Sequence, residues 1–122
     1  MRTWSGEPRC NLRDEDRIRF QHMIDAAETV ARFVDGRERA DLDSDQMLFF
    51  AVVRAIEVLG EAASRISEEA KADFVEVPWV SVVGMRNRLV HGYFDINADL
   101  VWKTATTEIP ALITPLRRAI GS

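Results

Sequence analysis

The sequence predicts an all-α protein, folded as an antiparallel bundle of four to five helices. Apolar residues recur at steps of three and four over long stretches, the spacing of one helix face. No alternating apolar and polar run is long enough for a pair of strands. The chain has 122 residues, 47% of them hydrophobic, which is enough for one packed domain. We expect this domain at residues 13–122 and a poorly ordered leader at residues 1–12, which contain Gly6 and Pro8.

The first helix is expected at about residues 14–35. Three acidic residues, Asp14, Glu15 and Asp16, fall in its first turn, where the helix dipole favours negative charge. Gly36 is a plausible end, because glycine readily adopts the left-handed conformation that follows many helices. The apolar stripe of this helix comprises Met23, Ala26, Ala27, Val30, Phe33 and Val34.

The second helix is expected after a charged linker at residues 37–43, and it should extend to about Glu69. Asp43 is its predicted N-cap, with Gln46 at the reciprocal position of a capping box. The first half of this helix is apolar on nearly all sides. Such a helix is either central in a bundle or faces a second subunit, so the sequence favours a homodimer.

The third helix is expected from Pro78 to Val90 or His91. Proline is tolerated in a first helical turn because its missing N–H has no partner there in any case. Gly92 is the predicted end.

The last helix should begin after the cap residue Asn97 and reach about Ala119. Pro110 and Pro115 lie within it, and each removes a backbone donor. We therefore expect these prolines to kink this helix or divide it.

Charge and cysteine content exclude several classes of protein. The formal net charge is -4, whereas proteins that bind nucleic acid over their whole surface are normally basic, so any contact with RNA must be local. A single cysteine, Cys10, forms neither an internal disulfide nor a metal cluster, and with two histidines a zinc site is not expected. These features, with no visible signal peptide or membrane span, predict a cytoplasmic protein without metal or cofactor.

The residues with the clearest potential for chemistry lie between Gly84 and Phe94, in the stretch Arg86-Asn87-Arg88-Leu89-Val90-His91-Gly92-Tyr93. At about 100° per residue, Arg86 and His91 would lie roughly 140° apart on a continuous helix. They converge only if the helix ends near His91 or if a second chain completes the site. The motif therefore indicates a helix end that opens into a cleft.

These residue types suit the cleavage of RNA, which carries its own nucleophile in the 2′-hydroxyl. Cleavage without a metal needs proton transfer at that hydroxyl and at the leaving 5′-oxygen, and His91 titrates in the range that this requires. Arg86 suits two-point contact with phosphate oxygens. A structural alternative is that Arg86 and His91 cap carbonyls or pair with acids such as Glu57, Glu61 or Asp95.

Several motifs together resemble one family. The spacing Arg86-x4-His91 matches the signature of the HEPN superfamily, and its extension to Tyr93 is similar to the HepT toxins of HepT–MntA toxin–antitoxin systems. Further parts that resemble the family are Ile56–Ala63, Val77-Pro78-Trp79 and the stretch Phe94–Trp102. The resemblance covers residues 14–118, nearly the whole expected domain.

The resemblance implies an all-α homodimer whose two motifs form a cleft at the interface. It implies a metal-independent endoribonuclease of a type VII-like system, with tRNA among the substrates. Arg86 and His91 would be catalytic, and Asn87, Arg88 and Glu61 supporting. An MntA-like minimal nucleotidyltransferase would neutralise the toxin by transferring AMP to Tyr93.

Two other functions fit the same residues. The chain could be a non-catalytic subunit of a minimal nucleotidyltransferase, binding nucleotide or substrate in its cleft. It could also be a dimeric helical scaffold. RNA cleavage that depends on His91 separates the first function from both.

Overall fold

The computed structural model describes residues 12–89 and 96–121, and within these ranges the regular structure is helical, without strands. The predicted all-α class is therefore confirmed. The elements are α1 (Asp14–Val34), α2 (Asp41–Ser44), α3 (Gln46–Ser64), α4 (Glu68–Asp73), α5 (Trp79–Val83), α6 (Met85–Leu89), α7 (Ala98–Lys103), the π-helical segment η2 (Thr104–Glu108) and α8 (Pro110–Ala119).

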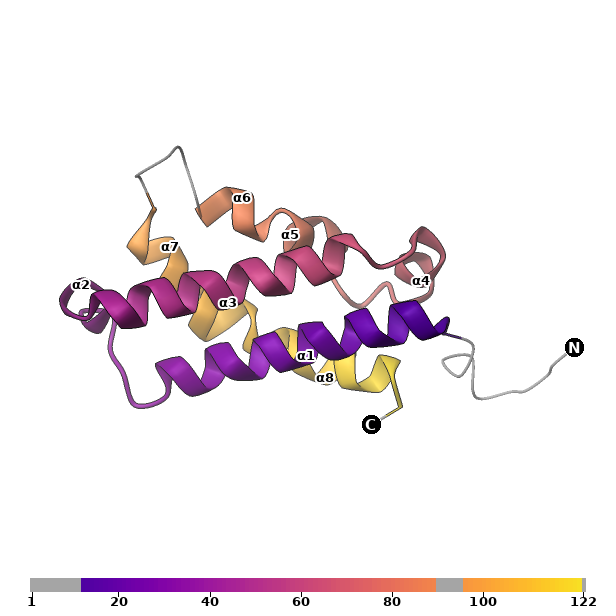
Figure 1. Cartoon of the computed structure of the whole chain (residues 1–122), viewed down its shortest axis with the longest axis horizontal. Coiled ribbons are helices and arrows are strands. Elements are labelled where there is room, and N and C mark those ends of the chain that lie inside the picture. The colour runs from indigo at the N-terminus through magenta and orange to yellow at the C-terminus, as the bar shows by residue number, and fades with distance from the viewer. Residues whose placement is uncertain (1–11, 90–95, 122) are drawn as a thin grey trace, which may run out of the picture.

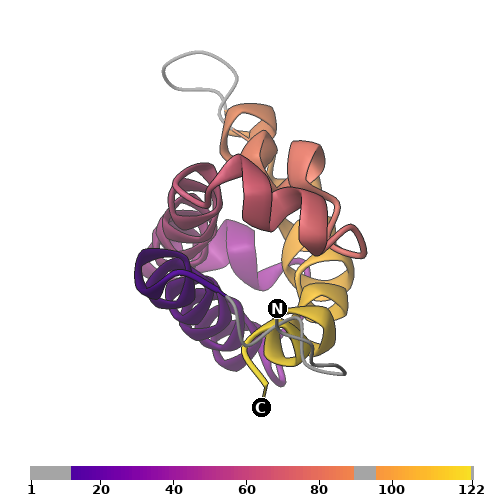
Figure 2. The same cartoon turned by 90° about the vertical axis from the view of Figure 1, so that its right-hand side faces the viewer.

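The two long helices α1 and α3 lie side by side and run in opposite directions (Figure 1). The segments α5 and α6 lie along α3, and α7, η2 and α8 form the other side of the molecule (Figures 1 and 2). The core fills the space between these layers. Its largest fully buried side chains include Phe20, Met23, Ile56, Leu59 and Leu116.

The first helix forms as predicted. Its first turn holds the expected acidic residues, and it ends at Val34. Gly36 follows with φ of 73°, a conformation that costs glycine little and most other residues much more. The buried positions of α1 include Met23, Ala27 and Val30, so the predicted stripe faces the core.

The start of the second helix was predicted at the wrong aspartate. Asp43 lies inside the short helix α2, and Asp45 is the N-cap of α3, where its side chain accepts a hydrogen bond from the Leu48 amide at 3.1 Å. Asp45 has the extended backbone that an N-cap needs, with φ of -121° and ψ of 94°. The predicted capping box of Asp43 and Gln46 is therefore wrong.

The end of the second helix was also predicted too late. The helix α3 ends at Ser64, and a separate helix, α4, begins at Glu68. Ser67 separates the two because its hydroxyl accepts a hydrogen bond from the Ala70 amide at 3.1 Å and so caps α4.

The third predicted helix begins where expected, since α5 starts at Trp79, directly after Pro78. It is divided at Gly84, after which α6 runs to Leu89. The predicted end at Val90, His91 and Gly92 lies outside the described residues, as does the leader up to residue 11.

The last predicted helix has the expected cap. Asn97 accepts a hydrogen bond from the Leu100 amide at 3.0 Å, and α7 follows. Division occurs at one of the two prolines. The π-helical segment η2 precedes Pro110, the first residue of α8, whereas α8 continues through Pro115. Among the described helices, none combines the length and apolarity needed to cross a bilayer.

Candidate functional site

The short helix α6 carries the first half of the predicted motif. Met85 and Leu89 are buried and hold α6 against the core, while Asn87 and Arg88 are exposed. Arg86 lies in α6 between these anchoring positions. The structure therefore presents this part of the motif on a helix that its own apolar residues fix to the domain.

His91 and Tyr93, predicted as a catalytic residue and as the modification target, lie outside the described residues. Their roles remain predictions from the sequence.

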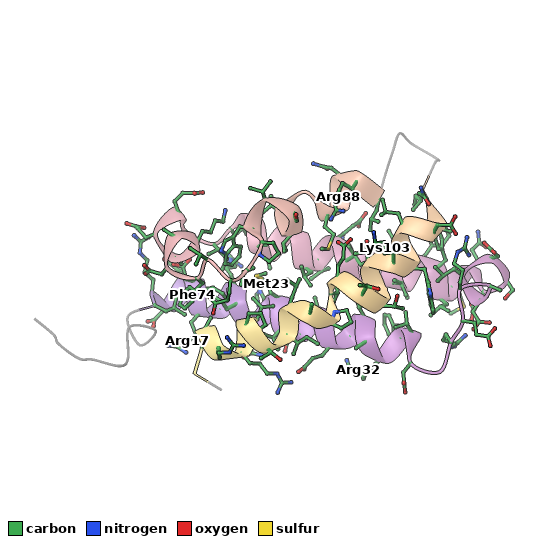
Figure 3. All side chains as sticks on the ribbon, turned by 180° about the vertical axis from the view of Figure 1, so that it is seen from behind. Arg17, Met23, Arg32, Phe74, Arg88 and Lys103 are labelled. Carbon is green, nitrogen blue, oxygen red and sulfur yellow. The ribbon has the colours of Figure 1, made fainter. Side chains whose placement is uncertain are left out.

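Arg88 connects α6 to two other segments. Its guanidinium donates to the carbonyl oxygen of Ser81 at 3.3 Å and to Oε1 of Glu108 at 3.4 Å. Glu108 belongs to η2, so the ion pair joins α6 to the π-helical segment that precedes α8. Arg88 is labelled in Figure 3. This contact gives Arg88 a role in holding α6 in place.

Glu61, predicted as a supporting residue, lies exposed on α3. Its Oε2 accepts hydrogen bonds from Nη2 of Arg65 at 3.0 Å and from Nε of the same side chain at 3.2 Å. A contact of Glu61 with Arg86 or His91 remains a prediction.

Glu61 also lines a polar groove between α1 and α3, which the sequence analysis did not predict. The groove has a volume of about 420 Å³. It brings together Arg19 and His22 of α1 with Arg54, Glu57, Val58, Glu61 and Ala62 of α3 and with Arg65, the C-cap residue of α3. The α3 residues recur at steps of three and four, so their common face could have been read from the sequence.

The charges in this groove are partly paired within the chain. Arg54 lies 3.4 Å from Glu57, and Arg65 pairs with Glu61. No ion pair joins α1 to α3 across the groove among the described residues. The groove therefore presents charges of both signs to whatever contacts it.

Metal ligands do not cluster in the part of the chain that the structure describes. Within residues 12–89 and 96–121, no group of three His, Cys, Asp or Glu side chains could hold a metal ion.

The family model "Ribonuclease HepT-like" matches residues 23–119. This range includes the groove residues from Arg54 to Arg65, the helix α6 and the whole Arg86–Tyr93 motif.

Curated relatives cover most of the chain. A protein of Caldanaerobacter subterraneus subsp. tengcongensis named "Putative RNase" is 35% identical over 76% of this chain and 83% of its own length. A protein of Methanocaldococcus jannaschii with the same kind of name is 33% identical over 74% of this chain and 83% of its own length. A "Probable ribonuclease HepT" of Thermococcus cleftensis is 34% identical over 76% of this chain and 84% of its own length. No solved structure matches the chain significantly.

Proposed function

Because this chain belongs to the HepT-like ribonuclease family, we propose that it is a ribonuclease toxin that cleaves RNA without a metal ion. The observation that carries the proposal is the match over residues 23–119, which contains the complete Arg86-x4-His91 motif, to a family described as ribonucleases. The relatives' names support RNA as the substrate class.

The proposed reaction is attack of the RNA 2′-hydroxyl on the adjacent phosphorus. The 2′-oxygen loses its proton to a base and forms a bond to phosphorus, while the bond to the 5′-oxygen breaks and that oxygen takes up a proton. The products are a 2′,3′-cyclic phosphate and a free 5′-hydroxyl. His91 transfers protons, and Arg86 stabilises the negative charge on the pentavalent phosphorane through its paired N–H donors.

Three further residues support this site in the proposal. Asn87 is exposed on α6 beside Arg86, where its amide can bind RNA. Arg88 keeps α6 in position through its contacts with Ser81 and Glu108. Glu61 orients cationic groups from α3, as it already does for Arg65.

We further propose a homodimer, because one chain supplies a single motif histidine while the reaction needs both a base and an acid. The RNA substrate is tRNA in this proposal, and the protein acts in the cytoplasm, where tRNA is found. The family resemblance supports these statements.

The function is tested by RNA cleavage in the presence of EDTA. His91→Ala and Arg86→Ala should each lower the cleavage rate by at least about 100-fold, because they remove proton transfer and charge stabilisation. Arg32→Ala, which changes an exposed arginine of α1 away from the motif, should cleave at the wild-type rate. A folded wild-type protein that binds nucleotide but cleaves no RNA would instead support the non-catalytic subunit.

Regulation is proposed to act through Tyr93 and an MntA-like nucleotidyltransferase. The phenol oxygen attacks the α-phosphorus of ATP, loses its proton and releases pyrophosphate, which leaves AMP on the tyrosine. A bulky anion two residues from His91 should exclude RNA by charge and volume. With the partner enzyme and ATP, intact mass should increase by AMP units in the wild type and not in Tyr93→Phe. An equal increase in Tyr93→Phe contradicts this assignment.

A further inference from the structure

We propose that a groove beside the motif helix recognises a guanine base of the RNA strand. This α6–η2 groove lies between α5 and α6 on one side and η2 and α8 on the other, and its volume is about 400 Å³. Its lining combines polar and apolar side chains, among them Ser81, Arg88, Glu108, Val82, Met85 and Leu112. The inference deepens the proposed function, and it rests on that function only in taking RNA as the substrate.

The apolar lining of the α6–η2 groove is anchored in the core. Val82, Met85 and Leu112 are each almost fully buried, with at most 3% of their surface exposed. Pockets for small ligands usually measure about 300–1,000 Å³ and combine apolar walls with a few polar groups that fix the orientation of the ligand. The groove has both properties.

Charge decides which part of RNA the α6–η2 groove can take. Its lining includes two carboxylates, of Glu76 and Glu108, and one guanidinium, of Arg88. Arg118 lies 4.0 Å from Glu76, which at most balances the charge. A phosphate needs a surplus of positive charge, whereas a base is neutral and offers donors and acceptors at its edge. The groove therefore suits a base and not the RNA backbone.

Arg88 and Glu108 lie side by side in this groove with part of their hydrogen-bonding capacity unused. Nη2 of Arg88 donates to the carbonyl oxygen of Ser81 at 3.3 Å and to Oε1 of Glu108 at 3.4 Å, which uses both of its hydrogens. Among the described residues, Nε and Nη1 of Arg88 and Oε2 of Glu108 have no further partner. The two side chains are 40% and 30% exposed, so these atoms are accessible to a ligand.

The unused groups select guanine among the four bases. Because Nη2 is occupied, Arg88 cannot present two parallel N–H groups and serves a single acceptor of a base. The carboxylate of Glu108, by contrast, can accept from two N–H groups. On its Watson–Crick edge guanine has two neighbouring donor groups, at N1 and N2, beside one acceptor, O6. Adenine, cytosine and uracil each have one donor group on that edge, so they leave part of the carboxylate unmatched.

The α6–η2 groove adjoins the motif of the proposed reaction. Arg88 follows Arg86 by two positions on α6, which is about 3 Å along the helix axis (Figure 3). Asn87, between them, is exposed. Proteins read RNA sequence mainly through unstacked bases of single strands. A strand that crosses α6 can therefore place a phosphate at the motif and a neighbouring base in the groove, which selects the phosphate that is attacked.

The test is the affinity of the full wild-type chain for short oligouridine strands with one central base, measured by fluorescence anisotropy. Every ribose carries a 2′-O-methyl group, so no strand can be cleaved by attack of a 2′-hydroxyl. A central guanine should bind about 10-fold or more tightly than adenine, cytosine or uracil. A central 7-deazaguanine should bind like guanine, because N7 has no partner. Hypoxanthine, which lacks the N2 amino group, should bind several-fold less tightly than guanine.

Glu108→Gln replaces a carboxylate oxygen by an amide donor that opposes the donors of guanine. It should bring the four bases to within about 2-fold of one another. Affinity for the plain uridine strand should not fall, because a negative charge is removed. Glu68→Gln is the matched control, since Glu68 pairs with Lys71 at the same distance of 3.4 Å on α4, outside the groove. This control should keep the preference for guanine.

Equal affinity of the wild type for the four bases overturns the inference, and so does a guanine preference that persists in Glu108→Gln. An equal loss of affinity for all strands in Glu108→Gln would give Glu108 a structural role only, which also overturns it. If Glu108→Gln fails to fold, the 7-deazaguanine and hypoxanthine strands test the same contacts on the wild type. Tight binding of 7-deazaguanine and weaker binding of hypoxanthine support the inference, and the reverse order contradicts it.

Two further outcomes separate this inference from its neighbours. If guanosine monophosphate alone binds as tightly as the guanine strand, the groove is a site for free nucleotide and the assignment to RNA is wrong. Affinity is measured without cleavage, so a guanine preference in a chain that cleaves no RNA contradicts only the proposed function. Cleavage by a chain without that preference contradicts only the inference.

Discussion

At the scale of single residues, the carboxylate of Asp16 links the first turn of α1 to the start of α4. It is only 3% exposed, and it accepts hydrogen bonds from the Ser67 amide at 2.9 Å and from the Ser67 hydroxyl at 2.7 Å. Ser67 in turn caps α4 through the Ala70 amide. One side chain of the first turn of α1 therefore fixes the beginning of α4, fifty-one positions along the chain.

Asp16→Ala should lower the free energy of unfolding by about 2–4 kcal/mol, because two hydrogen bonds to a charged group are lost and a part-buried amide is left without this partner. Asp14→Ala, in the same turn but exposed, should change it by less than about 0.5 kcal/mol. Urea unfolding of both variants measures the difference. Equal effects would show that Asp16 contributes only through the helix dipole.

The sequence indicated the candidate site by residue type and spacing, and it could not supply the partners of each side chain. Asn87 and Arg88 could be assigned to the motif because they adjoin Arg86. The contact of Arg88 with Glu108 spans twenty positions and depends on the packing of α6 beside η2, which no local pattern encodes. The pairing of Glu61 with Arg65 is local, four positions apart, and was predictable from helical spacing.

At the scale of elements, the beginning of α3 shows how neighbouring capping residues compete. Asp43 and Asp45 are both good caps by residue type. Asp43 lies within α2 and pairs with Arg39, which leaves Asp45 to adopt the extended conformation and bind the Leu48 amide. The short helix α2 therefore determines which aspartate begins α3.

Asp45→Ala should lower the free energy of unfolding by about 1 kcal/mol, the usual value of an N-cap. Asp43→Ala removes an exposed ion pair and should lower it by less than about 0.5 kcal/mol. Thermal unfolding followed by circular dichroism gives both values. A larger loss of unfolding free energy in Asp43→Ala than in Asp45→Ala would show that Asp43 is the N-cap, as the sequence predicted.

The divisions of the longer helices were only partly predictable. Pro110 was expected to interrupt the last helix, and the π-helical turn before it widens the backbone where its ring would otherwise meet a carbonyl of the preceding turn. Gly84 and Ser67 end helices in this structure, yet both residue types also occur inside helices. The deciding contacts, such as Asp16 with Ser67, come from distant parts of the chain.

At the scale of the whole molecule, an acidic protein of net charge -4 is proposed to act on RNA. The two facts agree if RNA is bound locally, at the motif that begins with Arg86 on α6. The helix α3 lies against α1, α5 and α6. The sequence left open whether its apolar first half is central in the bundle or faces a second subunit, and it favoured the second subunit. The sequence could not show which side of α3 stays exposed, because that depends on how the other helices pack against it.

The central claim is that this chain cleaves RNA by attack of the 2′-hydroxyl, with His91 transferring protons. The most direct measurement is the mass of the fragments released from a tRNA probe in EDTA by the wild type and by His91→Ala. The account predicts fragments ending in a 2′,3′-cyclic phosphate with the wild type and intact tRNA with His91→Ala. Intact tRNA with both proteins, or wild-type fragments bearing a 5′-phosphate, would contradict it.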